Sequence, residues 1–194
     1  ERFPTLDELY TYGGGKTLSL NLEKESSNNY ELGFKASAYD LGGSSNTVSL
    51  KTTGFYNDID NMIASGPAGG AYYVNISKAR IYGVEVEGSY ESDIFFARLA
   101  YAYIKGENRL TGAPLTTVPQ NTLAFTLGSR YEPWNLEYGV RATIADKADY
   151  VLAPANPRNP FSGDGLATAW NTVDLFATWK PQDGHLKGWD AQVR

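Results

Sequence analysis

Residues 136 to 147 read LEYGVRATIADK, a stretch in which apolar side chains alternate with polar, small or charged ones. The apolar side chains occupy every second position: Leu136, Tyr138, Val140, Ala142 and Ile144. Successive side chains of a β-strand point to opposite faces, so a strict period of two indicates a strand with two chemically different faces. The stretch therefore predicts a strand that borders an apolar environment on one side and a polar environment on the other.

The same alternation returns along the whole chain. It is found at residues 30–38, 82–90, 95–103, 123–131, 173–179 and 189–193. The positions between the apolar ones carry the charges, among them Glu31, Lys35, Glu85, Arg98 and Arg141. Together with the turn residues that separate them, these patterns predict eight strands near residues 28–38, 46–63, 72–90, 94–105, 121–131, 135–147, 170–180 and 188–194. We expect an all-β chain with an antiparallel, up-and-down order of strands.

The alternation alone leaves open which face of the sheet is turned inward. A soluble lipocalin-like barrel has its apolar side chains inside, whereas a membrane barrel has them outside, around an aqueous interior. Aromatic residues stand at the ends of the apolar stripes, for example Tyr30, Tyr90, Tyr131 and Trp179, as expected at a boundary between lipid and water. The stripes also contain many small residues, which would leave voids in a close-packed core but cost little against fluid acyl chains. Both features favour a transmembrane β-barrel.

The predicted connections alternate between short and long. Those near residues 39–46, 91–93, 132–135 and 181–188 are short, and those near 64–71, 106–117 and 148–169 are longer. Successive connections of an up-and-down barrel lie at opposite ends, so one end has tight turns and the other has extended loops, as in outer-membrane barrels. A stripe of about nine residues, at roughly 3.3 Å per residue and a tilt of about 45°, rises about 20 Å, close to the apolar band of such barrels.

Composition excludes several other classes of protein. The chain has 194 residues and a mean hydropathy of -0.38, and it contains no apolar run long enough for a transmembrane helix. It contains no cysteine, which removes disulfides, thiolate metal sites and thiol nucleophiles. Its net charge of -5 argues against nucleic acid as a partner. We interpret residues 1–194 as part of a single barrel domain.

We further expect this sequence to be an open arc of a wider barrel. No signal peptide precedes Glu1, and the last predicted strand stops in mid-alternation at Arg194. Residues 1–27 have the character of the end of an earlier strand and its long loop. An arc of about eight strands has two unpaired edges, and each unpaired backbone amide in lipid costs several kcal/mol, so we expect the arc not to fold alone.

Several stretches resemble the late barrel region of TonB-dependent outer-membrane receptors. They are ERFPTLDELY at residues 1–10, NLEKES at 21–26, NYELGFK at 29–35, FYNDIDNMI at 55–63, YVNI at 73–76, ARIYGVEVEG at 79–88 and VPQNTL at 118–123. The resemblance covers almost the whole chain. It implies a 22-stranded barrel in the outer membrane of a Gram-negative bacterium, with the N-terminal plug, the signal peptide and the closing C-terminal strands outside this sequence.

The resemblance also implies a function and partners. Such receptors import scarce chelates on energy that the TonB complex relays from the inner membrane to the plug. The partners implied for this chain are the outer-membrane lipid, a transported iron chelate and, through the plug, the TonB complex. No resident cofactor is implied.

Within that family, the sequence is most similar to the heme and hemoprotein receptors. Residues 2–4 and 21–22 match parts of the two sequence boxes that flank a heme-ligating loop histidine in those receptors. Residues 11–20 contain no histidine, so axial ligation of heme iron would fall to a tyrosine such as Tyr10 or Tyr12, or to a residue outside this sequence. Heme, a hemoprotein and a ferric siderophore all stay open as ligands.

The longest predicted connection, residues 148–169, is a second candidate ligand-binding segment. It contains Tyr150, Arg158 and Phe161, and aromatic rings with an arginine suit a flat anionic chelate. Loops of this length in compact barrels are usually functional or disordered. A proline-rich loop that is merely stiff is the alternative.

The polar face offers candidate contacts for the lumen and the plug. Arg98, Arg130 and Arg141 stand on it, and their charges suit the surface of a plug held inside the barrel. The alternative is that such charges form cross-strand ion pairs with a structural role only.

Two further groups of polar residues have ordinary explanations. Asn57, Asp58, Asp60 and Asn61 supply oxygens that Ca²⁺ binds, but their spacing is not that of an EF-hand and such residues commonly cap turns at strand ends. His185 is the single histidine and lies in a predicted short turn, where a solvated side chain is far commoner than a metal ligand or a catalytic base.

The sequence thus predicts a transporter that takes up an iron chelate across the outer membrane. One alternative is a small structural or adhesion barrel of the OmpA type, with loops that bind surfaces. Another is an outer-membrane hydrolase, but no Ser/His/Asp arrangement occurs, and residues 13–17 (GGGKT) lack the spacing and the strand-to-helix setting of a phosphate-binding loop. We expect no enzymatic activity.

Overall fold

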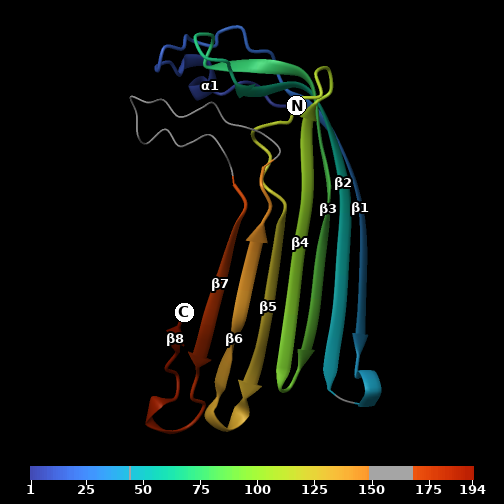
Figure 1. Cartoon of the computed structure of the whole chain (residues 1–194), viewed down its shortest axis with the longest axis vertical. Coiled ribbons are helices and arrows are strands. Elements are labelled where there is room, and N and C mark those ends of the chain that lie inside the picture. Colours follow the sequence, from blue (N-terminus) through green and yellow to red (C-terminus); the bar gives the residue numbers. More distant parts are fainter. Residues whose placement is uncertain (44, 149–167) are drawn as a thin grey trace.

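The computed structural model describes residues 1–43, 45–148 and 168–194, and within them eight strands form one sheet (Figure 1). The strands are β1 (Ser26–Tyr39), β2 (Asn46–Ser65), β3 (Tyr73–Ser92), β4 (Phe95–Asn108), β5 (Thr122–Tyr131), β6 (Leu136–Ala145), β7 (Trp170–Trp179) and β8 (Ala191–Val193). Each strand pairs antiparallel with the next strand of the chain. The predicted all-β, up-and-down order is confirmed, and β1 and β8 are the two edges of an open sheet.

The strand boundaries differ from the predicted ones mainly at the strand ends near the long connections and in the edge strand β8. β1, β2 and β4 run two or three residues further toward the long connections than the alternation indicates. β8 has only three residues, because Gly188 has a left-handed φ of 90° and Trp189 donates its backbone N–H to Leu186 at 3.0 Å. A turn at residues 187–188 and the irregular residues 189–190 therefore stand where the sequence predicts the start of a strand.

The register brings all the apolar stripes to one face of the sheet. One row of paired residues on this face consists of Ala36, Leu50, Gly88, Leu99, Phe125, Ala142 and Val173. The neighbouring row on the opposite face consists of Ser37, Ser49, Ser89, Arg98, Thr126, Arg141 and Asp174. We term these surfaces the apolar face and the charged face. Side chains on the apolar face are open to the surroundings, with Leu32 83% and Leu175 73% exposed.

Three phenylalanines on the charged face cover glycines on the neighbouring strands. The pairs are Phe55 with Gly83, Phe96 with Gly128, and Phe176 with Gly139. A Cβ atom added to these glycines would lie 2.7, 2.2 and 2.8 Å, respectively, from a ring carbon of the paired phenylalanine. A ring that lies over a glycine of the adjacent strand replaces the missing side-chain contact and fixes the register.

A small buried core lies at the end of the sheet where the long connections are. It consists of Ile59, Met62, Ala79, Leu115 and Val118, with Ile76, Ile81 and Ile104 packed against it. Because Leu115 and Val118 follow β4, the β4–β5 connection folds back over the charged face. Gly106 is required here, since a Cβ at this position would lie 2.3 Å from the side chain of Val118.

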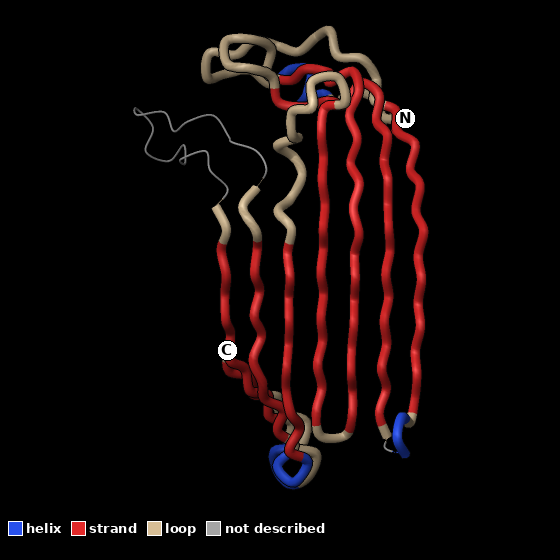
Figure 2. Tube along the Cα trace, turned by 45° about the vertical axis from the view of Figure 1, so that its right-hand side comes forward, coloured by secondary structure: helices blue, strands red, loops and turns tan. Residues whose placement is uncertain are grey.

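In the described residues the helices are short and lie outside the sheet. The α-helix α1 (Leu6–Tyr10) lies beside the long connections, and the 3₁₀ helices Leu41–Gly43, Glu132–Trp134 and Gly184–Leu186 lie in the short ones (Figures 1 and 2). None of the helices in the described ranges has the length and hydropathy needed to cross a membrane. The expectation that residues 1–27 hold the end of an earlier strand and its long loop agrees with the antiparallel bridge between Arg2 and Glu25. The segment between these two residues also contains α1, and β1 already begins at Ser26.

We expect Gly128→Ala to destabilise the barrel by about 1–3 kcal/mol, because the added methyl group overlaps the buried ring of Phe96. The urea midpoint of unfolding in lipid vesicles measures this loss in the whole barrel protein. Gly54→Ala is the matched control, since its Cβ meets only a carbonyl oxygen at 4.0 Å. An equal effect of the two substitutions would show that the ring does not restrict Gly128.

Candidate functional site

Four charged side chains form a chain of ion pairs on the charged face, near the short turns. Glu91 accepts hydrogen bonds from Arg98 Nη2 and from Arg130 Nη2, both at 2.7 Å. Arg130 also donates through Nε to Glu137 at 3.1 Å. We term these four residues the charge cluster. Two of the arginines predicted to face the lumen are therefore joined through one carboxylate.

The ring of Phe96 supports both arginines of the charge cluster. The guanidinium carbons of Arg130 and Arg98 lie 4.7 and 5.2 Å from its centroid, within the range of cation–π contacts. Phe96 itself is 1% exposed. Because a single exposed ion pair contributes about 0–1 kcal/mol, the shared carboxylate and the stacked ring order this surface more than any one pair does.

The third predicted arginine lies on the same face, two strands further along the sheet from Arg98. Arg141 donates through Nε to Thr126 Oγ1 at 3.4 Å. Together with Arg98, Phe176 and Asp174 it lines a cavity of about 210 Å³. The fold thus gathers the three arginines on one face of the sheet, where Arg98 and Arg141 line the same cavity.

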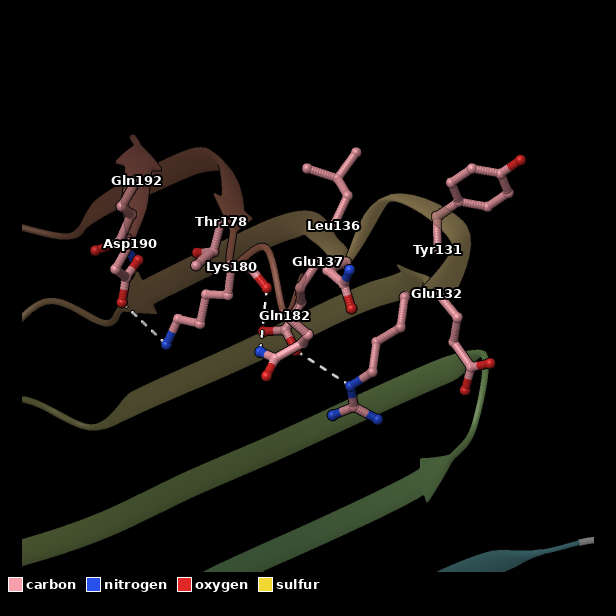
Figure 3. Close-up of a pocket in the computed structure, with 11 residues that line it drawn as sticks. Tyr131, Glu132, Leu136, Glu137, Thr178, Lys180, Gln182, Asp190 and Gln192 are labelled. Atoms are coloured by element: carbon pink, nitrogen blue, oxygen red, sulfur yellow. Dashed lines mark hydrogen bonds and ion pairs between the residues drawn. The ribbon is translucent and has the colours of Figure 1, made fainter. Parts of the chain in front are cut away.

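A larger groove of about 450 Å³ lies beside the charge cluster (Figure 3). Arg130 and Glu137 line it from the β5–β6 hairpin, and Lys180 and Asp190, which form an ion pair of 3.1 Å, line it from the β7–β8 hairpin. The sequence did not predict this groove, because its walls come from two hairpins that meet only in the folded sheet. Its position near the short turns separates it from the predicted ligand-binding loops.

Residues 1–25 lie across the opposite end of the sheet and hold the tip of the β2–β3 hairpin, residues 62–76; we term these two segments the cap (Figure 1). Asn61, with a left-handed φ of 56°, bends β2 just before the tip. Its side-chain amide donates to Glu23 at 2.8 Å. Asn75 accepts the backbone N–H of Glu23 at 2.8 Å and donates to the Asn61 carbonyl at 2.7 Å. Two asparagines on neighbouring strands thus fix the bend.

Further contacts fasten residues 1–25 to the hairpin tip. Lys16 donates to the carbonyl of Gly66 at 2.7 Å, and its Nζ lies 5.1 Å from the ring centroid of Tyr72. Ser19 is 3% exposed and accepts the backbone N–H of Tyr73 at 2.7 Å. The two segments of the cap are therefore held together by hydrogen bonds of their own. No sequence motif predicts this arrangement.

An ion-pair network joins α1 to the rest of the cap. Thr5 and Glu8 form a capping box at the start of α1. Arg2 donates to both carboxylate oxygens of Glu8 at 2.9 and 2.8 Å and to Glu25 at 3.3 Å, and Glu25 accepts the backbone N–H of Ile63 at 3.0 Å. Partial burial raises the pKa of the Glu8 carboxyl, but hydrogen bonds from Arg2 and Thr5 outweigh this effect and lower the pKa below its ordinary value.

Of the residues predicted to contact a ligand, only Tyr10 and Tyr12 lie in the part of the chain that the structure describes. Tyr10, at the end of α1, is 57% exposed, and Tyr12 is 76% exposed, so both phenol groups are accessible on the cap. Tyr150, Arg158 and Phe161 lie outside the described residues. Their predicted role stays a prediction.

The polar residues considered for calcium binding and for catalysis do not form a site of either kind in the described residues. Asp58 binds Arg109 at 2.8 Å and Asp60 binds Lys78 at 2.6 Å, so both carboxylates are engaged in ion pairs. In the part of the chain that the structure describes, no three His, Cys, Asp or Glu side chains are grouped in a way that could hold a metal ion. His185 is exposed in the short β7–β8 connection.

We expect the cap to loosen as the pH falls through the acidic range. A carboxyl with a lowered folded-state pKa stabilises the fold fully above its unfolded pKa, about 4.3, and this contribution is lost as the pH falls through the lower folded value. The mobility of a nitroxide on Tyr12→Cys, followed from about pH 6 to about pH 3, measures the change. Glu8→Gln should raise the mobility at neutral pH and flatten the profile. Identical profiles with and without Glu8→Gln would contradict this role of Glu8.

Comparison with known proteins identifies a family whose β-barrel model matches the whole chain. The family model described as "TonB dependent receptor-like, beta-barrel" matches residues 1–194. TonB-dependent heme receptor A of Haemophilus influenzae (strain 86-028NP) is 26% identical over 230 residues, which covers 99% of this chain and 30% of that relative. The chain spans about 30% of the length of this curated relative.

Solved structures show a similar fold. The FrpB iron transporter from Neisseria meningitidis (F3-3 variant) has a TM-score of 0.58 and 23% identity, covering 86% of this chain and 25% of that chain. The copper transporter OprC has a TM-score of 0.67 and 16% identity, covering 92% of this chain and 27% of that chain. At these identities the likeness concerns the fold alone.

Proposed function

Because this chain belongs to the TonB-dependent receptor β-barrel family, whose members lie in the outer membrane of Gram-negative bacteria, we propose that it forms part of the barrel wall and outer loops of a receptor that imports an iron chelate. The observation that carries the proposal is the separation of the apolar and charged faces from the short turns up to the stacked rings of Tyr56 and Tyr82. An arc with this separation borders lipid on one side and an aqueous lumen on the other. The plug and the TonB complex would act on the lumen side.

The proposed ligand is heme, alone or in a hemoprotein, or a ferric siderophore. The cap lies at the end with the long connections, which is the outer end of such barrels. It exposes Tyr10 and Tyr12 together with Phe3 and Leu6, which are 72% and 74% exposed. A phenolate oxygen is an established ligand of heme iron, and exposed aromatic and aliphatic groups suit the flat face of a chelate. The name of the heme receptor from Haemophilus influenzae supports heme among these ligands.

The charge cluster and Arg141 are proposed to face the plug. A plug is a folded, polar domain, so the wall that holds it needs ionic and hydrogen-bonding groups in fixed positions. Arg98 and Arg130 are fixed by Glu91 and by the ring of Phe96, and they retain guanidinium donors for further acceptors.

We expect Tyr10→Phe combined with Tyr12→Phe to weaken heme binding to the whole receptor by about tenfold or more, because both candidate phenolate ligands are removed. Tryptophan quenching during titration with heme and with a panel of ferric siderophores measures the affinities. Tyr39→Phe, at the short-turn end of β1, is the matched control. Unchanged binding of every chelate by the double variant would remove the two tyrosines from the proposed site. A receptor that binds no iron chelate would contradict the proposed function itself.

We expect Arg98→Ala combined with Arg130→Ala to loosen the plug and make cells more permeable to a large antibiotic such as vancomycin. Lys24→Ala combined with Lys187→Ala removes two exposed cations that lie outside the strands and should leave the permeability unchanged. The heat-induced shift in electrophoretic mobility verifies that each barrel is folded. Permeability at the wild-type level in a folded double arginine variant would contradict the plug contact.

A further inference from the structure

On the described strands, the charged side chains of the apolar face are all in one region. On strands β1 to β8 they are Asp58, Asp60, Lys78, Arg80, Lys105 and Glu107, all on β2, β3 and β4 and all near the long connections. Arg109, directly after β4, joins them through its ion pair with Asp58 at 2.8 Å. We term these seven residues the collar.

The collar begins where a row of aromatic residues ends. Tyr56 on β2 pairs with Tyr82 on β3, and their rings stack with centroids 6.4 Å apart. On the next strand, β4, Tyr103 pairs with Val84 of β3. Asp58 pairs with Arg80 two residues from the tyrosine pair along β2 and β3, which is about 7 Å closer to the long connections. Because tyrosine rings mark the boundary between hydrocarbon and headgroups, the collar lies at headgroup level in the placement proposed above.

The collar contains more cations than carboxylates and presents both in fixed geometry. Arg80 binds Glu107 at 2.7 Å, Lys78 binds Asp60 at 2.6 Å, and the cation of Arg80 lies 5.5 Å from the ring centroid of Tyr82. The side chains of Lys78 and Arg109 are 50% and 40% exposed. A guanidinium has five N–H donors and an ammonium has three, so groups that are already paired can still donate to a phosphate.

The opposite end of the apolar face has a different composition. There the outward positions of the strands hold Tyr90, Phe95, Tyr131 and Trp179, and none of the described strands carries a lysine or arginine at such a position. The chain as a whole is acidic, with a net charge of -5. A local excess of cations on the lipid-facing side, at the outer end alone, is a specific feature of this wall.

We infer that the collar binds the phosphate groups of lipid headgroups in the outer leaflet of the membrane. The four cations would contact phosphate oxygens, and the three carboxylates would hold the cations in place and limit the net charge. This inference rests on the outer-membrane placement of the proposed function, but it does not depend on which chelate the receptor imports.

The test compares lipid binding by the whole receptor and by two matched variants in detergent micelles. Lys78→Gln combined with Lys105→Gln removes two collar cations, and Lys35→Gln combined with Lys51→Gln removes two cations from the charged face. Native mass spectrometry measures the binding of lipid A, a diphosphorylated disaccharide lipid, and of its dephosphorylated form. The collar variant should bind lipid A about fivefold more weakly for each lysine removed, whereas the control variant should match the wild type.

Several outcomes would overturn the inference. They are equal affinity of wild type and collar variant for lipid A, an equal loss in the control variant, and equal binding of the phosphorylated and dephosphorylated lipids. Displacement of lipid A by inorganic phosphate would indicate a site for free phosphate in place of a lipid site. If the double variant does not fold, Lys105→Gln alone serves as the collar variant. Chelate titration of the same samples separates this result from the proposed function, because loss of lipid binding leaves chelate binding intact.

Discussion

Each strand of this sheet sends alternate side chains into two different environments, and the rest of the structure depends on that constraint. A shift of the register by one residue would move Arg98 and Arg141 onto the apolar face and Leu99 and Val140 onto the charged face. In lipid such a shift would place charges in hydrocarbon at a cost of a few kcal/mol each near the midplane. The antiparallel register is therefore determined along the whole apolar band, although the buried core in the described residues lies only at the end with the long connections.

Local packing reinforces the register where the alternation alone is weak. Glycines on the charged face lack side chains, and the rings of Phe55, Phe96 and Phe176 lie over three of them. The ring of Phe96 then serves as a platform for Arg98 and Arg130, so one aromatic contact orders both the strand pair and the charge cluster. At the other end, the bend at Asn61 and the hydrogen bonds of Glu23 direct the β2–β3 tip over the sheet. The lumen wall and the cap are thus built by different interactions on the same strands.

The sequence predicts the part of the fold that faces lipid, because there the environment imposes a period of two on every strand. Beyond the apolar band this constraint ends, and β1, β2 and β4 extend further through backbone pairing than their side chains indicate. The cap could not be predicted, because no period of two applies outside the apolar band. Its contacts, such as those of Glu23 with Asn61 and of Lys16 with Gly66, join residues far apart in sequence. The positions of Arg98, Arg130 and Arg141 on one face follow from periodicity, but the role of Phe96 beneath two of them requires the register.

The orientation of the two faces is tested most directly by spin labels at single cysteines, which the chain permits because it has none of its own. Leu32→Cys and Leu175→Cys place a nitroxide on the apolar face, and Thr53→Cys and Thr143→Cys place one on the charged face of the whole receptor in lipid vesicles. The account predicts that labels at the first two positions collide mainly with dissolved oxygen and those at the last two mainly with a water-soluble nickel chelate. The reverse pattern, with the leucine positions open to the nickel chelate, would contradict it.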